Sequence, residues 1–293
     1  MSRNKISGES VFSVFNSIFL MLLTIITVYP VLYVAFASIS DPFEMMKHRG
    51  ILLLPKGFSL AAYKAVIQNP NIAMGYGNTL FYVVIGTALS VTLTALAAFV
   101  LSRKSFTPRR YIMIGIVFSM MFSGGMIPLY LLVRDLGLYN TRWAIIFPTA
   151  INTINFIIMR TSFMEIPDSM EESVKMDGAN DVQVLYHIVL PLSKAVVAVI
   201  TLFYAVYYWN SWFNASIYLS NRSLYPLQLI LREILIQNDT ASMMIGTAAA
   251  DNQPIGETIK YATIMVSTIP ILCVYPFLQK YFVQGVMLGA VKG

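Results

Sequence analysis

Charged residues are scarce in this sequence of 293 residues. They make up 12% of the chain, against 57% for hydrophobic residues, whereas soluble domains carry about 25% charged residues. Too few charges are present to solvate a whole protein surface, so we expect much of the exterior to face lipid. The net charge of +6 suits cationic loops that meet anionic lipid headgroups. The basic residues do not form the broad face that a nucleic-acid-binding protein needs.

Cysteine, histidine and phosphate-binding motifs are also scarce or missing. Cys273 is the single cysteine, so it cannot form an internal disulfide. The two histidines, His48 and His187, are too few and too far apart to indicate a metal or catalytic cluster. No Gly-x-x-x-x-Gly-Lys-Ser/Thr sequence occurs, so the chain encodes no P-loop. We therefore predict no catalytic residue, no metal site and no cofactor on this chain.

Six windows contain no Asp, Glu, Lys or Arg at all, namely residues 10–40, 65–102, 111–133, 143–159, 195–221 and 261–279. A lipid core of about 30 Å is crossed by about 20 helical residues, so each window predicts one helix. The first is too long for the core of a signal peptide and is expected to be retained. The expected fold class is an all-α membrane protein with a single transmembrane domain over residues 1–293. Its spans are expected at about 11–39, 76–101, 111–133, 143–164, 195–218 and 261–280.

The orientation follows from one short basic loop, which carries Arg103, Lys104, Arg109 and Arg110. Loops rich in lysine and arginine stay in the cytoplasm. An even number of spans then places both termini there as well. The expected location is the bacterial cytoplasmic membrane, with several passes.

The windows also lack the buried charges of an ion-driven carrier. Proton-coupled and ion-coupled transporters keep carboxylates, lysines or histidines inside the membrane as relays, and none of the six windows contains one. A driving force from outside this polypeptide is therefore favoured. The alternatives are a self-sufficient secondary carrier or channel, and a membrane-embedded enzyme, which would need clustered His, Asp or Glu.

The segment between the fourth and fifth windows, residues 166–191, predicts a helix, a turn and a second helix. Pro167 and Asp168 suit a helix start, and Asp168 and Glu171 have the spacing of a capping box. Gly178 suits a left-handed C-cap. Asn180 or Asp181 is expected to cap the second helix, and Pro191 to end it. On physical grounds alone, a plain interfacial helix is the alternative.

This segment resembles a motif of the permeases of binding-protein-dependent ABC importers. Their loop has Glu-Ala-Ala, three residues, Gly, nine residues, Ile, one residue and Leu-Pro. The present chain has Glu172-Ser173-Val174, Gly178, Ile188 and Leu190-Pro191 at the same spacing, and departs at the two alanines. The resemblance implies the type I importer permease fold and a cytoplasmic coupling helix that sits in a cleft of an ATPase subunit. The residues it assigns to coupling are Glu171, Glu172, Asp177, Gly178, Ile188, Leu190 and Pro191.

Further residues resemble the maltose-type second permease. These are Asp177-Gly178-Ala179, Trp209-Asn210, Asn78-Thr79-Leu80 and the ending Gly289-Ala-Val-Lys-Gly293. The segments 123–130 and 225–233 look like the LplC-type branch, which is associated with polysaccharide fragments, including uronate-rich ones such as alginate or pectin. The resemblance implies a second homologous permease, an ATPase dimer that binds ATP and Mg, an extracytoplasmic sugar-binding protein, a saccharide substrate and lipid as partners.

A saccharide pathway would need hydroxyl-pairing groups and flat apolar faces. Asn152 and Asn155 are three residues apart, and Tyr204 and Tyr208 four, so each pair is expected on one helix face. The alternative is that these side chains join helix to helix and that the aromatics form an interfacial belt. The candidate pathway residues are Asn152, Asn155, Tyr204, Tyr208, Trp209 and Asn210.

Two further contacts are implied by the resemblance. The outer loop, residues 221–260, is expected to touch the binding protein through Asp251, Asn252 and Gln253. The tail with Gly289 and Lys292, just beyond the sixth helix, is expected to reach the ATPase interface; a frayed end without a role is the alternative.

Overall fold

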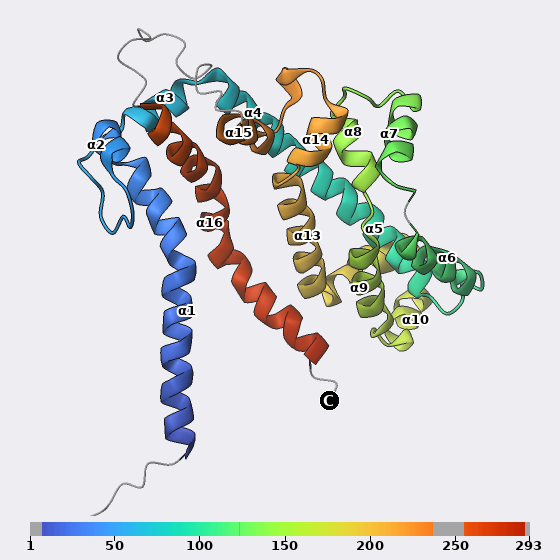
Figure 1. The fold of residues 1–293 in the computed structure, drawn as a ribbon. Helices are drawn as coiled ribbons and strands as arrows, with labels where there is room; N and C mark the ends of the chain where they lie inside the picture. The colour runs from blue at the N-terminus through green and yellow to red at the C-terminus, as the bar shows by residue number, and fades with distance from the viewer. Residues whose placement is uncertain (1–7, 123, 237–254, 291–293) are drawn as a thin grey trace, which may run out of the picture. The chain divides into compact units, whose positions relative to one another are not determined.

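The computed structural model describes residues 8–122, 124–236 and 255–290 (Figure 1). These residues form helices and connecting loops, and no strand occurs among them. The expected all-α fold class is thereby confirmed. The chain divides into two compact units, residues 1–69 with 233–269 and residues 70–232 with 270–293.

The first unit contains α1 (Gly8–Ser38), α2 (Pro42–Lys47), α3 (Ala61–Gln68) and the beginning of α16 (Ile255–Ala290). Large apolar side chains are exposed along α1, as expected for a helix in lipid. Tyr29 accepts a hydrogen bond from the backbone N–H of Leu52 at 3.0 Å, which holds the loop after α2 against the helix. Tyr33 packs edge-on against Tyr261 of α16, with ring centroids 5.9 Å apart.

The second unit is built around one long helix, α4 (Pro70–Phe81) with α5 (Thr87–Ser102), joined by a π-helical turn over Tyr82–Gly86. Against it pack α9 (Thr153–Met164) and α13 (Lys194–Trp209), which also contact each other (Figure 1). Polar bonds fix the register of α5 and α13. The hydroxyl of Tyr204 lies 2.8 Å from Thr94 Oγ1, and that of Tyr208 lies 2.9 Å from Ser90 Oγ.

Shorter helices complete this unit. They are α6 (Arg109–Met121), α7 (Met126–Asp135), α8 (Trp143–Ile146), α10 (Asp168–Met176), α11 (Asp181–Val184), α12 (Leu190–Leu192), α14 (Trp212–Tyr218) and α15 (Leu227–Ile236). Asn78 Nδ2 donates to the carbonyl oxygens of Ser223 and Tyr225, at 2.7 and 3.1 Å, and so ties α4 to the segment before α15.

Three of the charge-free windows are not the single helices that the sequence predicts. The third is divided into α6 and α7 around Gly125, whose φ is +85°. The fourth bends by 51° between the Trp143–Thr149 segment and α9, where the side chain of Asn152 caps the new helix. The fifth ends at Trp209 and resumes at Trp212. At the fourth window the Asn152 side chain satisfies two of the freed N–H groups, and at the third Gly125 supplies the positive-φ backbone conformation that the break needs.

Two helices among the described residues are long and apolar enough to cross a membrane, Phe12–Ser38 and Pro70–Ser102. The number rises to five if each bent helix pair counts as one span. The six spans and their bounds, and the single domain over residues 1–293, therefore stay predictions.

Gly86, the last residue of the π-helical turn before α5, lies directly against α13. A Cβ added there would lie 2.7 Å from ring carbons of Tyr208, whose side chain is fully buried. We expect Gly86→Ala to destabilise the chain by about 1–3 kcal/mol, because a pinned ring cannot move aside. Gly77→Ala is the matched control, since nothing lies within 4 Å of its Cβ and alanine favours a helix. Thermal unfolding in detergent checks this; equal melting temperatures would contradict it.

Candidate functional site

The segment of residues 166–191 folds as a helix, a tight turn and a second helical stretch. Helix α10 begins at Asp168 directly after Pro167, as the sequence predicts. The second stretch runs from α11 through a π-helical turn, Leu185–Val189, into α12. We call residues 166–191 the loop between spans.

The turn after α10 is a Schellman motif centred on Gly178. Its φ is +88°, which confirms the predicted left-handed C-cap. The N–H of Gly178 donates to the carbonyl of Lys175 at 3.0 Å, and that of Ala179 to the carbonyl of Val174 at 3.2 Å. These two bonds satisfy carbonyls that the helix end leaves free.

The second stretch begins with a full capping box. Asn180 Oδ1 accepts from the N–H of Gln183, and Gln183 Oε1 accepts from the N–H of Asn180, both at 2.9 Å. Of the two predicted caps, Asn180 is the one used. Pro191 was expected to end this helix, and that prediction is wrong, because Pro191 lies inside α12. The preceding π-helical turn accommodates a residue without N–H, and the chain bends by 89° only after Leu192.

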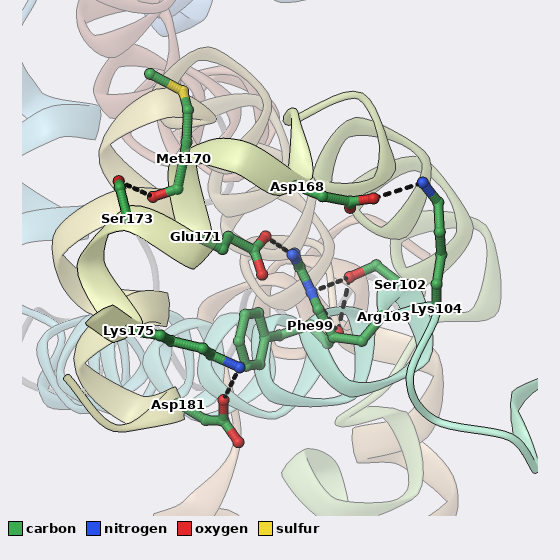
Figure 2. Close-up of polar contacts among 10 residues, drawn as sticks. All are labelled: Phe99, Ser102, Arg103, Lys104, Asp168, Met170, Glu171, Ser173, Lys175 and Asp181. Carbon is green, nitrogen blue, oxygen red and sulfur yellow. Dashed lines mark hydrogen bonds and ion pairs between the residues drawn. The ribbon is translucent and has the colours of Figure 1, made fainter. Parts of the chain in front are cut away.

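Ion pairs anchor α10 to the end of α5 (Figure 2). Glu171, which is only 7% exposed, pairs with Arg103. Arg103 also donates from Nε to Ser102 Oγ at 3.1 Å, and its guanidinium lies 4.6 Å from the ring centroid of Phe99. On the exposed side, Lys104 Nζ lies 2.6 Å from Asp168 Oδ2.

The predicted capping box of Asp168 and Glu171 is not formed, since α10 has no side-chain cap at its N-terminus. Both carboxylates instead bind basic residues more than sixty positions earlier. The sequence predicted that Arg103 and Lys104 lie in a cytoplasmic loop, but no sequence pattern indicated that they bind α10. A third pair, Lys175 with Asp181 at 2.7 Å, joins α10 to α11.

The two ion pairs on α5 differ in their surroundings. The hydrogen bond and charge of Lys104 hold the pKa of Asp168 below its usual range. The Lys104–Asp168 pair therefore stabilises the fold fully above the pKa that Asp168 has in the unfolded chain. This stabilisation is lost as pH falls through the lowered pKa of the folded state. Because both side chains are exposed, the stabilisation is small. Burial lowers the pKa of the Arg103 guanidinium, opposed by the charges of Asp168 and Asp181.

The loop between spans has one anchored face and one free face. Val184, Leu185 and Val189 are buried in the main apolar core, and Ile188 and Leu190 are half-buried. The opposite face carries exposed residues, with Met176 at 87%. It consists of Glu172, Ser173, Met176, Asp177 and Gly178, and we call it the exposed tip. A rigidly anchored tip of this kind can bind a partner and pass its movement to α5.

The predicted pathway residues fall into two groups. Asn152, Asn155 and Tyr204 line a cavity of about 500 Å³, together with Phe203 and Tyr207. Asn152 does not share a helix face with Asn155. Its side chain caps α9 by accepting from the N–H groups of Ile154 and Asn155 at 3.0 and 3.1 Å. Its own N–H donates to the hydroxyl of Tyr204 at 2.9 Å.

The other three predicted pathway residues do not line this cavity. Tyr208 is fully buried and bonds to Ser90. Trp209 packs edge-on against Tyr76 at 6.4 Å. Asn210 Nδ2 donates back to the carbonyl of Val206 at 2.8 Å. For Tyr208 the helix-to-helix alternative thus describes the observed contact. Phe203 and Tyr207, which line the cavity beside the helix break that precedes α9, were not predicted from the sequence.

The remaining candidates lie partly outside the described residues. Asp251, Asn252, Gln253 and Lys292 are not described. Gly289 was expected just beyond the sixth helix but lies within α16, which continues to Ala290. Within the described ranges, no three or more His, Cys, Asp or Glu side chains are grouped as metal ligands.

Comparison with known proteins decides the family. The family described as binding-protein-dependent transport system inner membrane component matches residues 90–288, which include the whole loop between spans. This chain belongs to that family. The resemblance inferred from the spacing of the loop is therefore confirmed, and with it a location in the inner membrane.

Relatives cover nearly the whole permease chain. It is 43% identical to the polygalacturonan/rhamnogalacturonan transport system permease protein YtcP of Bacillus subtilis, over 94% of this chain and 96% of that one. It is 41% identical to protein LplC of the same species, over 97% and 95%. A solved chain of a bacterial ABC transporter involved in the import of the acidic polysaccharide alginate is 34% identical, with a TM-score of 0.86 over 96% of this chain and 99% of that one.

The anchoring of α10 can be tested by removing one carboxylate at a time. We expect Glu171→Gln to cost about 3–5 kcal/mol, since it leaves the guanidinium of Arg103 buried without a counter-charge. Asp168→Asn is the matched control, because its ion pair is exposed and should change stability little. Hydrogen exchange of α10 and thermal unfolding measure both variants. If Glu171→Gln and Asp168→Asn changed stability equally, the buried pair would not be the main anchor of α10. The double variant Arg103→Gln/Glu171→Gln should be more stable than Glu171→Gln alone, because no unpaired charge is left buried, and equal stability of the two would also contradict the anchoring role.

Proposed function

We propose that this chain is one permease subunit of an ATP-driven, binding-protein-dependent importer that moves an oligosaccharide or polysaccharide fragment across the bacterial cytoplasmic membrane. The observation that carries the proposal is the exposed tip on a loop with the spacing and fold of a coupling helix, in a chain 43% identical to a polysaccharide permease. Family membership favours this function over a self-sufficient carrier or channel.

ATP hydrolysis is assigned to separate partner subunits, which would bind ATP and Mg. The absence of a P-loop sequence supports this assignment. The tip residues Glu172, Met176 and Asp177 would enter a cleft of the ATPase. Leu190, beside the buried Val184, Leu185 and Val189, would hold the second half of the loop on the apolar core. Ile188 is half-buried and Pro191 is exposed at the end of this half.

Movement of the tip has a direct route to the cavity. Glu171 and Asp168 join α10 to the end of α5. Along α5, Thr94 bonds to Tyr204 of α13, and Tyr204 accepts from the N–H of Asn152 at the start of α9. The hydroxyl of Tyr204, on α13, thus contacts both α5 and the start of α9. A shift of α5 relative to α13 would change the cavity lining, which is the coupling we propose.

The substrate class is proposed to be an acidic, uronate-rich saccharide. Support comes from the relatives, which belong to transport systems for polygalacturonan, rhamnogalacturonan and alginate. The cavity offers amide, hydroxyl and aromatic groups, and none of its described lining residues is a cation. Neutral donors would therefore bind the sugar hydroxyls here, and the countercharges for carboxylates would come from the second permease.

The assembly would contain a second homologous permease, an ATPase dimer, an extracytoplasmic sugar-binding protein and surrounding lipid. A solved chain from an alginate transporter in complex with a periplasmic protein shares the fold, at 15% identity and a TM-score of 0.54. Asp251, Asn252 and Gln253 are proposed to contact the binding protein, and Gly289 and Lys292 the ATPase interface. Both termini would be cytoplasmic.

Coupling is tested with Glu172→Lys and Gly178→Val. Both should lower substrate-stimulated ATP hydrolysis while the chain still inserts. A Cβ at Gly178 meets nothing within 4 Å, so the cost of valine comes chiefly from the positive φ and is about 1 kcal/mol or more. Glu44→Lys, an exposed charge reversal in α2, is the control for charge, and Gly178→Asn the control for backbone. Full stimulation in both test variants would refute the coupling role.

The pathway is tested with Asn155→Ala and Tyr207→Phe, which remove polar groups from the cavity wall. Each lost hydrogen bond to sugar, worth about 1 kcal/mol, should weaken transport about fivefold. Tyr208→Phe is the control, because its hydroxyl bonds to Ser90 and does not line the cavity. Uptake of defined oligosaccharides is measured beside basal hydrolysis. Unchanged uptake in both wall variants, or equal loss in the control, would disprove the pathway.

A further inference from the structure

A groove on the second unit combines cations with a long apolar wall. It lies between α6 and α9 and has a volume of about 750 Å³. Arg109 and Arg110 begin α6 at one end, where Arg160 of α9 joins them. The wall continues along α6 through apolar residues, chiefly Met113, Ile114, Val117, Phe118 and Met121. We call this the basic groove.

The positive charge of the basic groove is not neutralised from within. Among the residues that the structure describes, no acidic side chain lines it. Nη1 of Arg109 is buried and has no hydrogen-bond partner in the described part of the chain. The charges of Arg109 and Arg160 lie close enough to repel each other. The first turn of α6 has no acidic residue either, although the positive end of a helix dipole favours one.

One acid that shares a cavity with Arg109 is already engaged. Asp168 lines a small cavity that also includes Arg109. Its carboxylate, however, bonds to Lys104 at 2.6 Å. An external anion is therefore the group that would satisfy Arg109.

The apolar wall has the length of one lipid leaflet. From Arg109 to Met121 the helix rises about 18 Å, at about 1.5 Å per residue. Half of a hydrocarbon core is about 15 Å. Val117, Phe118 and Met121 are exposed, so an acyl chain can lie against them while a headgroup reaches the arginines.

We propose that the basic groove is a binding site for an anionic phospholipid. The phosphate pairs with Arg109, Arg110 and Arg160, and the acyl chains lie along α6. A helix of a partner protein would leave the long exposed apolar wall without the acyl chains that its length matches, and the test below distinguishes the two occupants. The proposal requires only that the chain lies in a membrane and is independent of the transported substrate.

The site also bears on the loop between spans. Arg109 lies on the wall of both the basic groove and the small cavity formed with Arg103, Lys104 and Asp168. A bound phosphate would reduce repulsion at the point where α10 is anchored to α5. Anionic lipid should therefore protect α10 from hydrogen exchange.

The test uses the full chain purified with its partner subunits and placed in nanodiscs. One set contains phosphatidylcholine alone, the other equal amounts of phosphatidylcholine and phosphatidylglycerol. Native mass spectrometry counts retained phosphatidylglycerol for the wild type and for Arg109→Gln, Arg110→Gln and Arg160→Gln. Retention should fall about fivefold for each arginine removed. Lys194→Gln, an exposed cation at the start of α13 outside the groove, should retain lipid like the wild type.

Two further arms separate the explanations. Val117→Trp fills the apolar wall and keeps the arginines, so it should also reduce retention, and free inorganic phosphate should not displace the lipid. If the Arg109→Gln or Arg160→Gln variant fails to fold, lipid retention by Arg110→Gln is the deciding measurement, because the side chain of Arg110 is exposed. Wild-type retention in the arginine variants would overturn the proposal. So would loss of the partner permease with unchanged lipid, which would make the groove a protein interface.

Discussion

The ion pair between Arg103 and Glu171 connects the helix that carries the exposed tip of this permease with α5, which in turn bonds to Tyr204 in the cavity wall. Arg103 directly follows α5, and Glu171 lies in the first turn of α10. Because the pair is largely buried, its charges depend on each other, and loss of either leaves the other in an apolar setting. The orientation of the exposed tip follows from this bond, from the Gly178 turn and from the Asn180 capping box.

A second constraint is the hydroxyl of Tyr204, on α13, which contacts both α5 and the start of α9. In a membrane the hydrophobic effect gives helices little reason to associate, so small residues and polar bonds set their register. Ser90 and Thr94 on α5, with Gly86 beside them, allow α13 to approach closely. The cavity then exists because α9 starts at Asn152 rather than continuing the helix before it.

In the second unit, the charged side chains and the neutral polar side chains gather at different places. Cations gather beside the loop between spans, where Arg103 and Lys104 bind α10 and three further arginines line the basic groove. The cavity beside Tyr204 is lined by neutral groups. A sugar in that cavity would meet hydrogen-bond partners without being trapped by a fixed charge, which suits release as well as binding. The cations instead hold protein and lipid in place.

Local rules predicted much of this protein correctly. The scarcity of charge indicated helices in lipid, and Pro167, Gly178 and Asn180 marked the start of α10, the turn and the next cap, because each depends on a few neighbouring residues. The spacing from Glu172 to Pro191 identified the family. Tertiary structure alone decided that Glu171 and Asp168 bind Arg103 and Lys104 rather than the backbone, and that Tyr208 joins two helices. It also decided that the fourth window breaks at Asn152. These outcomes depend on partners far away in sequence, and no local pattern encodes which distant residue will lie within reach.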